Sequence, residues 1–133
     1  MTLEHVAIWT NQLERLKDFY VKFFGGIANE KYVNTANQFE SYFLSFKSGA
    51  RLELMQKTGI PENRNDSRAQ YLGIIHLAFA VDTKKEVDEK AEAFRREGFL
   101  ILKGPRKTGD GYYEFETLDP DNNRLEITAR WVD

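Results

Sequence analysis

The chain has 133 residues, with 41% hydrophobic, 14% aromatic and 30% charged residues, no cysteine and a formal net charge of −2. This composition excludes a disordered chain, and the length favours one domain. The basic residues are scattered and slightly outnumbered, which excludes nucleic acid as a partner. Without thiolates, any metal ion must be held by nitrogen and oxygen ligands.

The N-terminus begins Met-Thr-Leu-Glu-His and has neither the basic region nor the long apolar region of a secretory signal. The longest apolar runs are far shorter than the roughly 20 residues that cross a membrane. We therefore expect a soluble, cytoplasmic protein without a membrane partner.

The first half of the chain predicts a strand, a helix and three more strands. The strand at residues 3–9 ends at Thr10 and Asn11, which are N-cap residue types. An apolar stripe of period 3.6 then predicts a helix that stops at Gly25. The next strands are expected at residues 27–33, 38–46 and 50–56. Residues 1–56 thus form a first βαβββ module.

The second half repeats this order. An apolar run at residues 74–81 predicts a buried strand, and Thr83 and Glu86 have the spacing of a capping box at the start of a helix that Gly98 ends. The next strands are expected at residues 99–103, 112–118 and 124–132, separated by turns at Gly104-Pro105 and at 119–123. The second βαβββ module covers residues 74–133, and the repeat predicts a duplicated α+β fold.

Two residue types recur at matching places in the modules. The chain has only two histidines, and each lies in the first expected strand of its module: His5 and His76. A glutamate in an apolar context lies in each last strand: Glu53 and Glu126. Desolvating a carboxylate is costly, so each glutamate must be exposed, paired or bound to a cation.

Geometry predicts that these side chains meet. If the first and last strands of a module are neighbours, its histidine and glutamate project from one face, and facing modules bring four ligands together. Such a set suits one divalent ion, namely Zn, Ni, Co, Mn or Fe. Taken singly, each residue also has an ordinary interpretation as a packed histidine or a solvated glutamate. Their matched positions favour the metal site.

A family resemblance rests on residues 5–8, 51–54, 76–79 and 119–127. These segments are similar to the vicinal oxygen chelate superfamily of glyoxalases, bleomycin resistance proteins and extradiol dioxygenases, and most of all to glyoxalase I, or lactoylglutathione lyase. The likeness covers nearly the whole chain, so that residues 1–133 are identified as a single vicinal oxygen chelate domain. It implies that the paired modules form a curved, partly open barrel around the metal, the glyoxalase-like fold.

The same resemblance implies a metal-dependent lyase or isomerase of the glyoxalase I type. Its substrate would be a hemithioacetal or a similar small hydroxy-carbonyl compound, which reacts through a metal-stabilised enediolate. Carried over by position, Glu126 is the candidate catalytic base and Glu53 its partner. We also expect a homodimer, since the facing modules can come from one chain or be exchanged between two.

Thiol recognition departs from the family pattern. The arginine that binds the glutathione carboxylate in bacterial glyoxalase I is replaced by Trp9, and an asparagine of that family is replaced by Lys57. Lys107 matches a basic position of the carboxylate-binding loop, and Arg106 beside it could bind a substrate carboxylate or phosphate. We take Trp9, Arg106 and Lys107 as candidate substrate-binding residues.

Two alternative functions on the same scaffold remain open. One is a metal-free resistance protein that sequesters an antibiotic in an aromatic cleft. The other is a metal-dependent thiol transferase or dioxygenase, whose metal generally has two histidine ligands and one glutamate. The complete set of two histidines and two glutamates favours the lyase over both.

Overall fold

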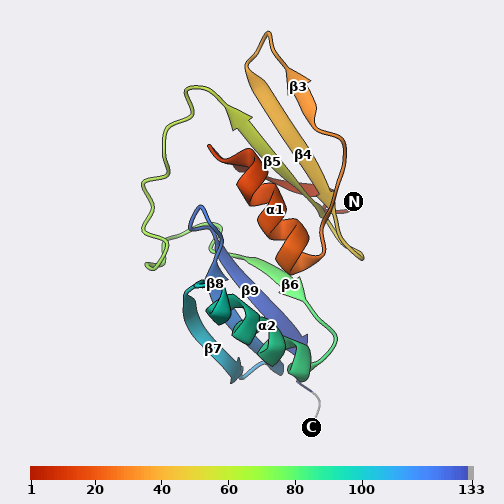
Figure 1. Ribbon diagram of the computed structural model, residues 1–133. Helices are drawn as coiled ribbons and strands as arrows, with labels where there is room; N and C mark the ends of the chain where they lie inside the picture. The colour runs from red at the N-terminus through yellow and green to blue at the C-terminus, as the bar shows by residue number, and fades with distance from the viewer. Residues whose placement is uncertain (132–133) are drawn as a thin grey trace. The chain divides into compact units, whose positions relative to one another are not determined.

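The computed structural model describes residues 1–131 and divides the chain into two compact units, Met1–Asn63 and Arg64–Asp133. Each unit is one β-sheet with an α-helix along one of its faces (Figure 1). Within residues 1–131, no helix is long and apolar enough to span a membrane.

Unit 1 is a five-stranded sheet. Its elements are β1 (His5–Trp9), α1 (Leu13–Phe24), β2 (Ile27–Ala28), β3 (Tyr32–Asn34), β4 (Phe39–Ser45) and β5 (Arg51–Lys57). The strand order is β1-β5-β4-β2, with β3 also pairing with β4, and β1 runs parallel to β5. The strand expected at 27–33 is therefore wrong as one element, because β4 pairs with two short strands instead.

One apolar face of α1 forms the core of unit 1 with the sheet. The helix packs against β4 and β5. The buried apolar side chains are Leu13, Leu16, Phe19, Tyr20, Leu44, Leu52 and Leu54. Because side chains alternate along a strand, the residue between Leu52 and Leu54 faces the opposite side of the sheet. The helix-free face is consequently available for polar groups.

The start of α1 differs from the expectation. The N-cap is Gln12, not Thr10 or Asn11, and it makes no side-chain cap hydrogen bond. The first helical N–H, that of Leu13, donates instead to Oε1 of Gln56 on β5 at 3.0 Å. A tertiary contact thus satisfies a donor that a local cap would otherwise serve. The helix ends as expected, with Gly25 in the left-handed conformation at φ 66°.

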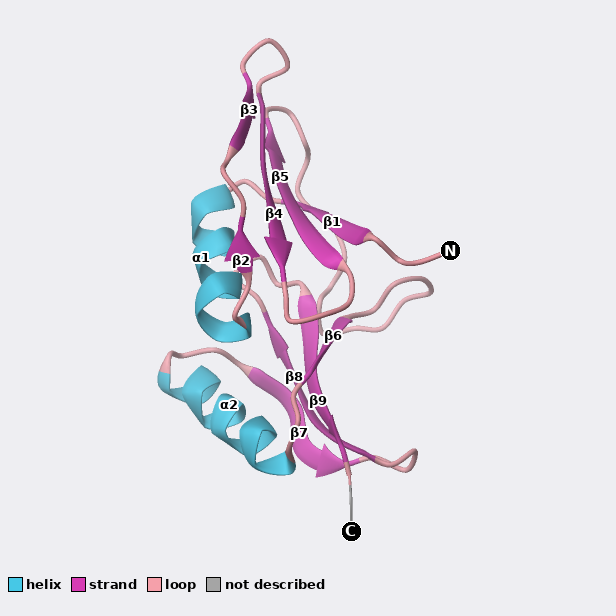
Figure 2. Cartoon of the chain, turned by 90° about the vertical axis from the view of Figure 1, so that its right-hand side faces the viewer, coloured by secondary structure: helices cyan, strands magenta, loops and turns pink. Residues whose placement is uncertain are grey.

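Unit 2 has the βαβββ order in its simplest form. Its elements are β6 (Leu77–Ala80), α2 (Lys84–Arg96), β7 (Ile101–Lys107), β8 (Tyr112–Leu118) and β9 (Arg124–Arg130). The strand order is β6-β9-β8-β7, with β6 parallel to β9. Figure 2 shows α2 along one face of this sheet. The duplicated α+β architecture is confirmed, while β6 is shorter than the expected 74–81, and Val132 of the last expected strand lies outside the described residues.

The capping box predicted for α2 is confirmed. The Thr83 hydroxyl accepts from the Glu86 N–H at 3.2 Å, and the Glu86 carboxylate accepts from the Thr83 N–H at 2.8 Å. The apolar stripe of Val87, Ala91 and Phe94, at the spacing of one helix face, is fully buried. It packs on β7, β8 and β9, so that these strands also keep one face free of the helix.

The loop between β8 and β9 sets the register of these strands. The buried Asp119 carboxylate accepts from the N–H groups of Asp121 and Asn123 and from the Asn123 side-chain amide, at 2.8 to 2.9 Å. These bonds close the predicted turn. As a result Glu116 on β8 lies directly opposite Glu126 on β9.

The turn expected at Gly104-Pro105 is wrong, because both residues lie inside β7. Lys103 pairs with Glu116 and Arg106 with Glu114, so two residues of β7 face one residue of β8 as a bulge. Gly104 has φ +83°, and a Cβ there would lie 2.4 Å from the Glu114 carbonyl oxygen. Only glycine fits this position without displacing backbone.

Replacing Gly104 with alanine should therefore destabilise the protein by about 2 to 4 kcal/mol, through the positive φ and the clash together. Gly109→Ala is the matched control, since Gly109 has no positive φ and no atom within 4 Å of an added Cβ. We expect this control to change stability by less than about 1 kcal/mol. Urea unfolding monitored by circular dichroism measures both, and equal stabilities of the two variants would contradict the bulge.

Candidate metal centre

In unit 1, parallel strand pairing brings a histidine and a glutamate together. His5 on β1 pairs with Arg51 on β5, and Ala7 pairs with Glu53. Alternation places the side chains of His5 and Glu53 on the face away from α1. The His5 Nε2 atom lies 3.8 Å from Glu53 Oε1, and the two side chains are 42% and 16% exposed.

The second nitrogen of the His5 ring faces a different carboxylate. His5 Nδ1 lies 2.6 Å from Glu4 Oε2, within hydrogen-bond distance. The Arg51 guanidinium donates to the other oxygen of Glu4. The hydrogen bond from His5 and, to a smaller extent, the hydrogen bond from Arg51 lower the pKa of the Glu4 carboxyl. Arg51 also lies over the Phe43 ring, 4.2 Å from its centroid.

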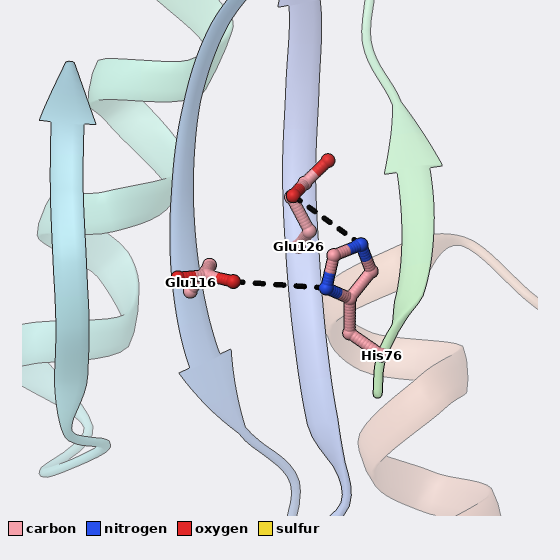
Figure 3. Close-up of side chains that lie close together, drawn as sticks. All are labelled: His76, Glu116 and Glu126. Carbon is pink, nitrogen blue, oxygen red and sulfur yellow. Dashed lines mark ion pairs between the residues drawn. The ribbon is translucent and has the colours of Figure 1, made fainter. Parts of the chain in front are cut away.

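Unit 2 repeats the pairing of histidine and glutamate. His76 immediately precedes β6, and Ala78 on β6 pairs with Glu126 on β9. His76 Nε2 lies 3.4 Å from Glu126 Oε2, and these side chains are 27% and 16% exposed. Figure 3 shows the imidazole between Glu126 on one side and a second glutamate, Glu116, on the other, with Nδ1 3.6 Å from Glu116 Oε1.

Glu116 is a site residue that sequence reasoning missed. Ligand atoms of His76, Glu116 and Glu126 all lie within 4.8 Å of one another, so these three residues could hold a metal ion. Glu116 occupies the place of Phe43 in unit 1, since each lies opposite the glutamate of the last strand. The available signal was the alternation in β8, where glutamates 114 and 116 flank the buried Phe115.

An arginine also lies beside this group. The Arg124 guanidinium is 3.4 Å from Glu116 Oε2, and the side chains are 9% and 15% exposed. Within residues 1–131, three buried nitrogens have no hydrogen-bond partner: His76 Nδ1, Arg124 Nε and Arg124 Nη1. Unpaired buried donors are costly, and they are characteristic of sites that take up another group.

Glu114 adds a third carboxylate to the helix-free face of unit 2. Burial raises the pKa of Glu114 to about 7, and a hydrogen bond to Glu126 and the negative charge of Glu126 add to this effect. Arg106, which pairs with Glu114 across β7 and β8, acts in the opposite direction. Three carboxylates crowded on a half-buried face favour the arrival of a cation.

The separations of the ligand atoms test whether these residues fit a divalent ion. Two ligands that each lie about 2.1 Å from a tetrahedral ion are about 3.4 Å apart. The distances from Nε2 to the glutamate oxygen, 3.8 Å in unit 1 and 3.4 Å in unit 2, are near this value and too long for good hydrogen bonds. Nitrogen and carboxylate donors suit borderline and hard divalent ions. The residues fit the ion expected from the sequence.

The four predicted ligands are thus brought together in pairs, one pair within each unit. The convergence of both pairs on a single ion stays a prediction.

Of the substrate-binding candidates, Trp9 ends β1 and is 42% exposed, with its ring edge-on to Phe39 at 6.1 Å. Arg106 and Lys107 are exposed at the end of β7, where Lys107 Nζ lies 4.7 Å from the centroid of the Trp131 ring. Their role in binding substrate also stays a prediction.

Comparison with known proteins identifies the family. The model of the Glyoxalase/Bleomycin resistance protein/Dioxygenase superfamily matches residues 2–127. The chain therefore belongs to this superfamily, which confirms the resemblance inferred from its motifs.

Individual relatives are distant. The uncharacterized protein YqjT of Bacillus subtilis (strain 168) is 25% identical over 130 residues, which cover 96% of this chain and 98% of that protein. The trypanothione-dependent glyoxalase I of Leishmania major matches 97% of this chain and 86% of its own, with a TM-score of 0.76 and 21% identity. A glyoxylase/bleomycin resistance protein/dioxygenase domain from Frankia sp. EAN1pec covers 98% of both chains, with a TM-score of 0.80 and 16% identity. At these identities the two structures show the fold alone.

If His76 is a metal ligand, a divalent ion such as Zn²⁺ should stabilise the folded protein. When the free ion concentration is one hundred times the dissociation constant, binding at one site adds about 2.7 kcal/mol to the free energy of unfolding. The thermal unfolding midpoint rises as a result. His76→Asn should remove most of this increase, whereas Glu92→Gln, on the exposed side of α2, should keep it. Differential scanning calorimetry with and without Zn²⁺ measures the shift, and an equal shift in wild type and His76→Asn would rule out His76 as a ligand.

Proposed function

We propose that this protein is a metal-dependent lyase or isomerase of the glyoxalase type, acting on a hemithioacetal or a similar small hydroxy-carbonyl compound. One observation carries the proposal. In each unit a histidine Nε2 faces a half-buried glutamate oxygen at 3.4 to 3.8 Å on the helix-free side of the sheet. Membership of the superfamily adds weight to this assignment.

The proposed metal centre combines both pairs around one divalent ion, with ligands His5, Glu53, His76 and Glu126. The equivalent registers of β1 with β5 and of β6 with β9 support this set, because each module contributes the same two ligand types. One chain can supply both modules, or the two chains of a homodimer can exchange them, and both arrangements yield the same four ligands.

The stoichiometry of metal binding tests this shared centre. A shared centre holds one ion per chain, whereas separate centres in the two units would hold two. We expect one Co²⁺ per chain from isothermal titration calorimetry, and loss of that single event in both His5→Asn and His76→Asn. Two independent binding events, each lost in only one variant, would contradict the shared centre. Absence of binding in wild type would favour the alternative of a metal-free antibiotic-binding protein.

In the proposed reaction, Glu126 is the catalytic base. Its carboxylate removes a proton from the hydroxyl-bearing carbon of the substrate and returns it to the adjacent carbonyl carbon, while the hydroxyl proton moves to the former carbonyl oxygen. One C–H and one O–H bond break and one of each forms, so no external oxidant or reductant is needed. The bound ion supplies Lewis-acid stabilisation of the negative charge that develops on the two neighbouring oxygens. Glu53 is the partner of Glu126 on the other module. Both carboxylates are largely removed from water, which strengthens their interactions with the reacting atoms.

The neighbourhood of the centre suggests what the substrate is like. Trp9 lies on the same face of β1 as His5, four residues along, and offers an exposed aromatic surface. Such a surface suits an apolar substituent better than the carboxylate that an arginine would bind. Arg106 is exposed and pairs with Glu114 on the helix-free face, so it is the proposed contact for an acidic part of the substrate. Lys107 pairs with Tyr113, whose hydroxyl donates to Asp88 on α2, and therefore lies on the opposite face of the sheet. We therefore propose that the thiol of the hemithioacetal differs from glutathione.

A thiol transferase or dioxygenase is the less favoured metal-dependent alternative. The known pattern of that class leaves one corner of the metal to the substrate, with two histidines and one glutamate. Here Glu53 is only 16% exposed and its oxygen faces His5 Nε2, as expected of a ligand. An assay of 2-oxoaldehydes with several thiols, run beside an oxygen-consumption assay, separates the two reactions.

Glu126→Gln tests the assignment of the base. Glutamine can still supply an oxygen to a metal but cannot accept the proton, and general base catalysis contributes about 10²- to 10⁴-fold. We expect kcat with the best 2-oxoaldehyde and thiol pair to fall by about that factor, while plasma emission spectroscopy still detects bound metal. Glu92→Gln is again the control and should keep full activity. Unimpaired turnover by Glu126→Gln would rule out this role.

A further inference from the structure

Each histidine ring lies between two carboxylates, and the same ring atom faces the same kind of partner in both units. Nε2 faces the glutamate of the last strand, at 3.8 Å in unit 1 and 3.4 Å in unit 2. Nδ1 faces a second glutamate, Glu4 in unit 1 at 2.6 Å and Glu116 in unit 2 at 3.6 Å. The two second glutamates come from unrelated places, one directly before β1 and the other within β8.

An arginine holds each of these second carboxylates. Arg51, the partner of His5 in the parallel register, donates to Glu4. Arg124 has the corresponding place in unit 2. Leu77 pairs with Leu125, and His76 and Arg124 are the residues directly before these two. Its guanidinium lies 3.4 Å from the Glu116 carboxylate. Both units therefore contain a chain of arginine, glutamate and histidine Nδ1, built from non-equivalent glutamates.

We propose that Glu4 and Glu116 are positioning residues that accept a hydrogen bond from Nδ1–H of His5 and His76, so that each Nε2 lone pair is directed at the metal ion. This inference rests on the proposed metal centre. A carboxylate only accepts hydrogen bonds when ionised, so the ring nitrogen that faces it carries the proton. In a neutral ring the other nitrogen then carries the lone pair, as a metal ligand must.

Direct coordination by Glu116 is the competing arrangement, because its distance to Nδ1 also fits two ligands of one ion. The arrangement in unit 1 favours the positioning role by analogy. There Nδ1 is committed to Glu4 at 2.6 Å, which leaves Nε2 as the available ligand atom. In unit 2 the Nδ1 atom is buried without a hydrogen-bond partner among the described residues. Movement by roughly half an ångström would bring Nδ1 and Glu116 into hydrogen-bond range.

The charge of the arginines supports the same division of roles. Arg124, only 9% exposed, keeps the Glu116 carboxylate engaged on the side away from the imidazole. A carboxylate that accepts Nδ1–H makes Nε2 a better electron donor, which raises metal affinity. Outer partners of this kind typically contribute 10- to 100-fold to metal affinity. A merely structural ion pair would not change the donor strength of the ring.

Nuclear magnetic resonance can test the proposal directly, because the chain has only two histidines. In Zn²⁺-loaded protein labelled with ¹⁵N-histidine, we expect both rings to show Nδ1 protonated and Nε2 bound to metal. His5→Asn and His76→Asn assign the signals. Binding of Zn²⁺ through Nδ1 of either ring would overturn the proposal. Absence of Zn²⁺ binding in wild type would contradict the proposed function itself, and the two failures are therefore distinguishable.

Paired variants of the second glutamates separate positioning from packing. Glu116→Leu removes the acceptor but should fold, since Phe43 occupies the equivalent position of unit 1. We expect it to weaken Zn²⁺ binding, measured by competition with a chelator, by about 10- to 100-fold. Glu116→Gln keeps a neutral acceptor and should recover part of this loss. For Glu4, next to His5, we expect the same order: Glu4→Leu should weaken Zn²⁺ binding more than Glu4→Gln does.

Glu92→Leu is the matched control, because Glu92 pairs with Arg95 on α2 and touches neither histidine. We expect its Zn²⁺ affinity to equal that of wild type. Unchanged affinity and unchanged ¹⁵N spectra in Glu116→Leu and Glu4→Leu would overturn the positioning role, even if wild type binds one ion as proposed. Equal losses in the Leu and Gln variants, with metal on Nδ1, would identify Glu116 as a direct ligand instead.

Discussion

The parallel pairing of the first and last strands in each unit is the constraint on which the site depends. It sets His5 opposite Arg51, and it puts Glu53 two residues further along the same strand. Because side chains alternate with a period of two residues, all three project from the helix-free face. A shift of the register by one residue would turn the glutamate into the apolar core and a leucine towards the histidine. The chemistry of the face therefore depends on backbone hydrogen bonds between two strands that are distant in sequence.

The two units use this constraint in different surroundings. In unit 1 the neighbouring strand contributes Phe43, and His5 lies edge-on to its ring at 5.4 Å. In unit 2 the same position is Glu116, with Glu114 two residues before it. Unit 2 therefore concentrates negative charge where unit 1 has an aromatic ring. The histidine and glutamate pair recurs in both units while the residues around it differ, as expected if the proposed ligand pairs share one task and their surroundings serve different parts of a substrate.

Much of the fold could be predicted because its signals are local. The stripe that ends at Phe94, the capping box at Thr83 and the left-handed Gly25 each depend on residues close in sequence. The errors arose where a distant strand decides the outcome. Gln56 replaces a local cap at the start of α1, and β8 pairs with β7 across Gly104, so that residues typical of a turn form a bulge within a strand.

The same distinction explains how much of the site could be predicted. Histidine is rare in this chain, so its recurrence at matching positions stood out without any knowledge of contacts. Glutamate is common, and the alternation in β8 shows only that Glu116 faces away from the core. Its pairing opposite Glu126 and its contact with Arg124 distinguish it from a solvated strand residue. Candidate metal ligands can be recognised in a sequence by residue type and position. The residues proposed to orient them can be identified only once the strand neighbours are known. If Glu116 orients His76 as proposed, a residue that the sequence does not reveal changes the donor strength of a ligand that it does reveal.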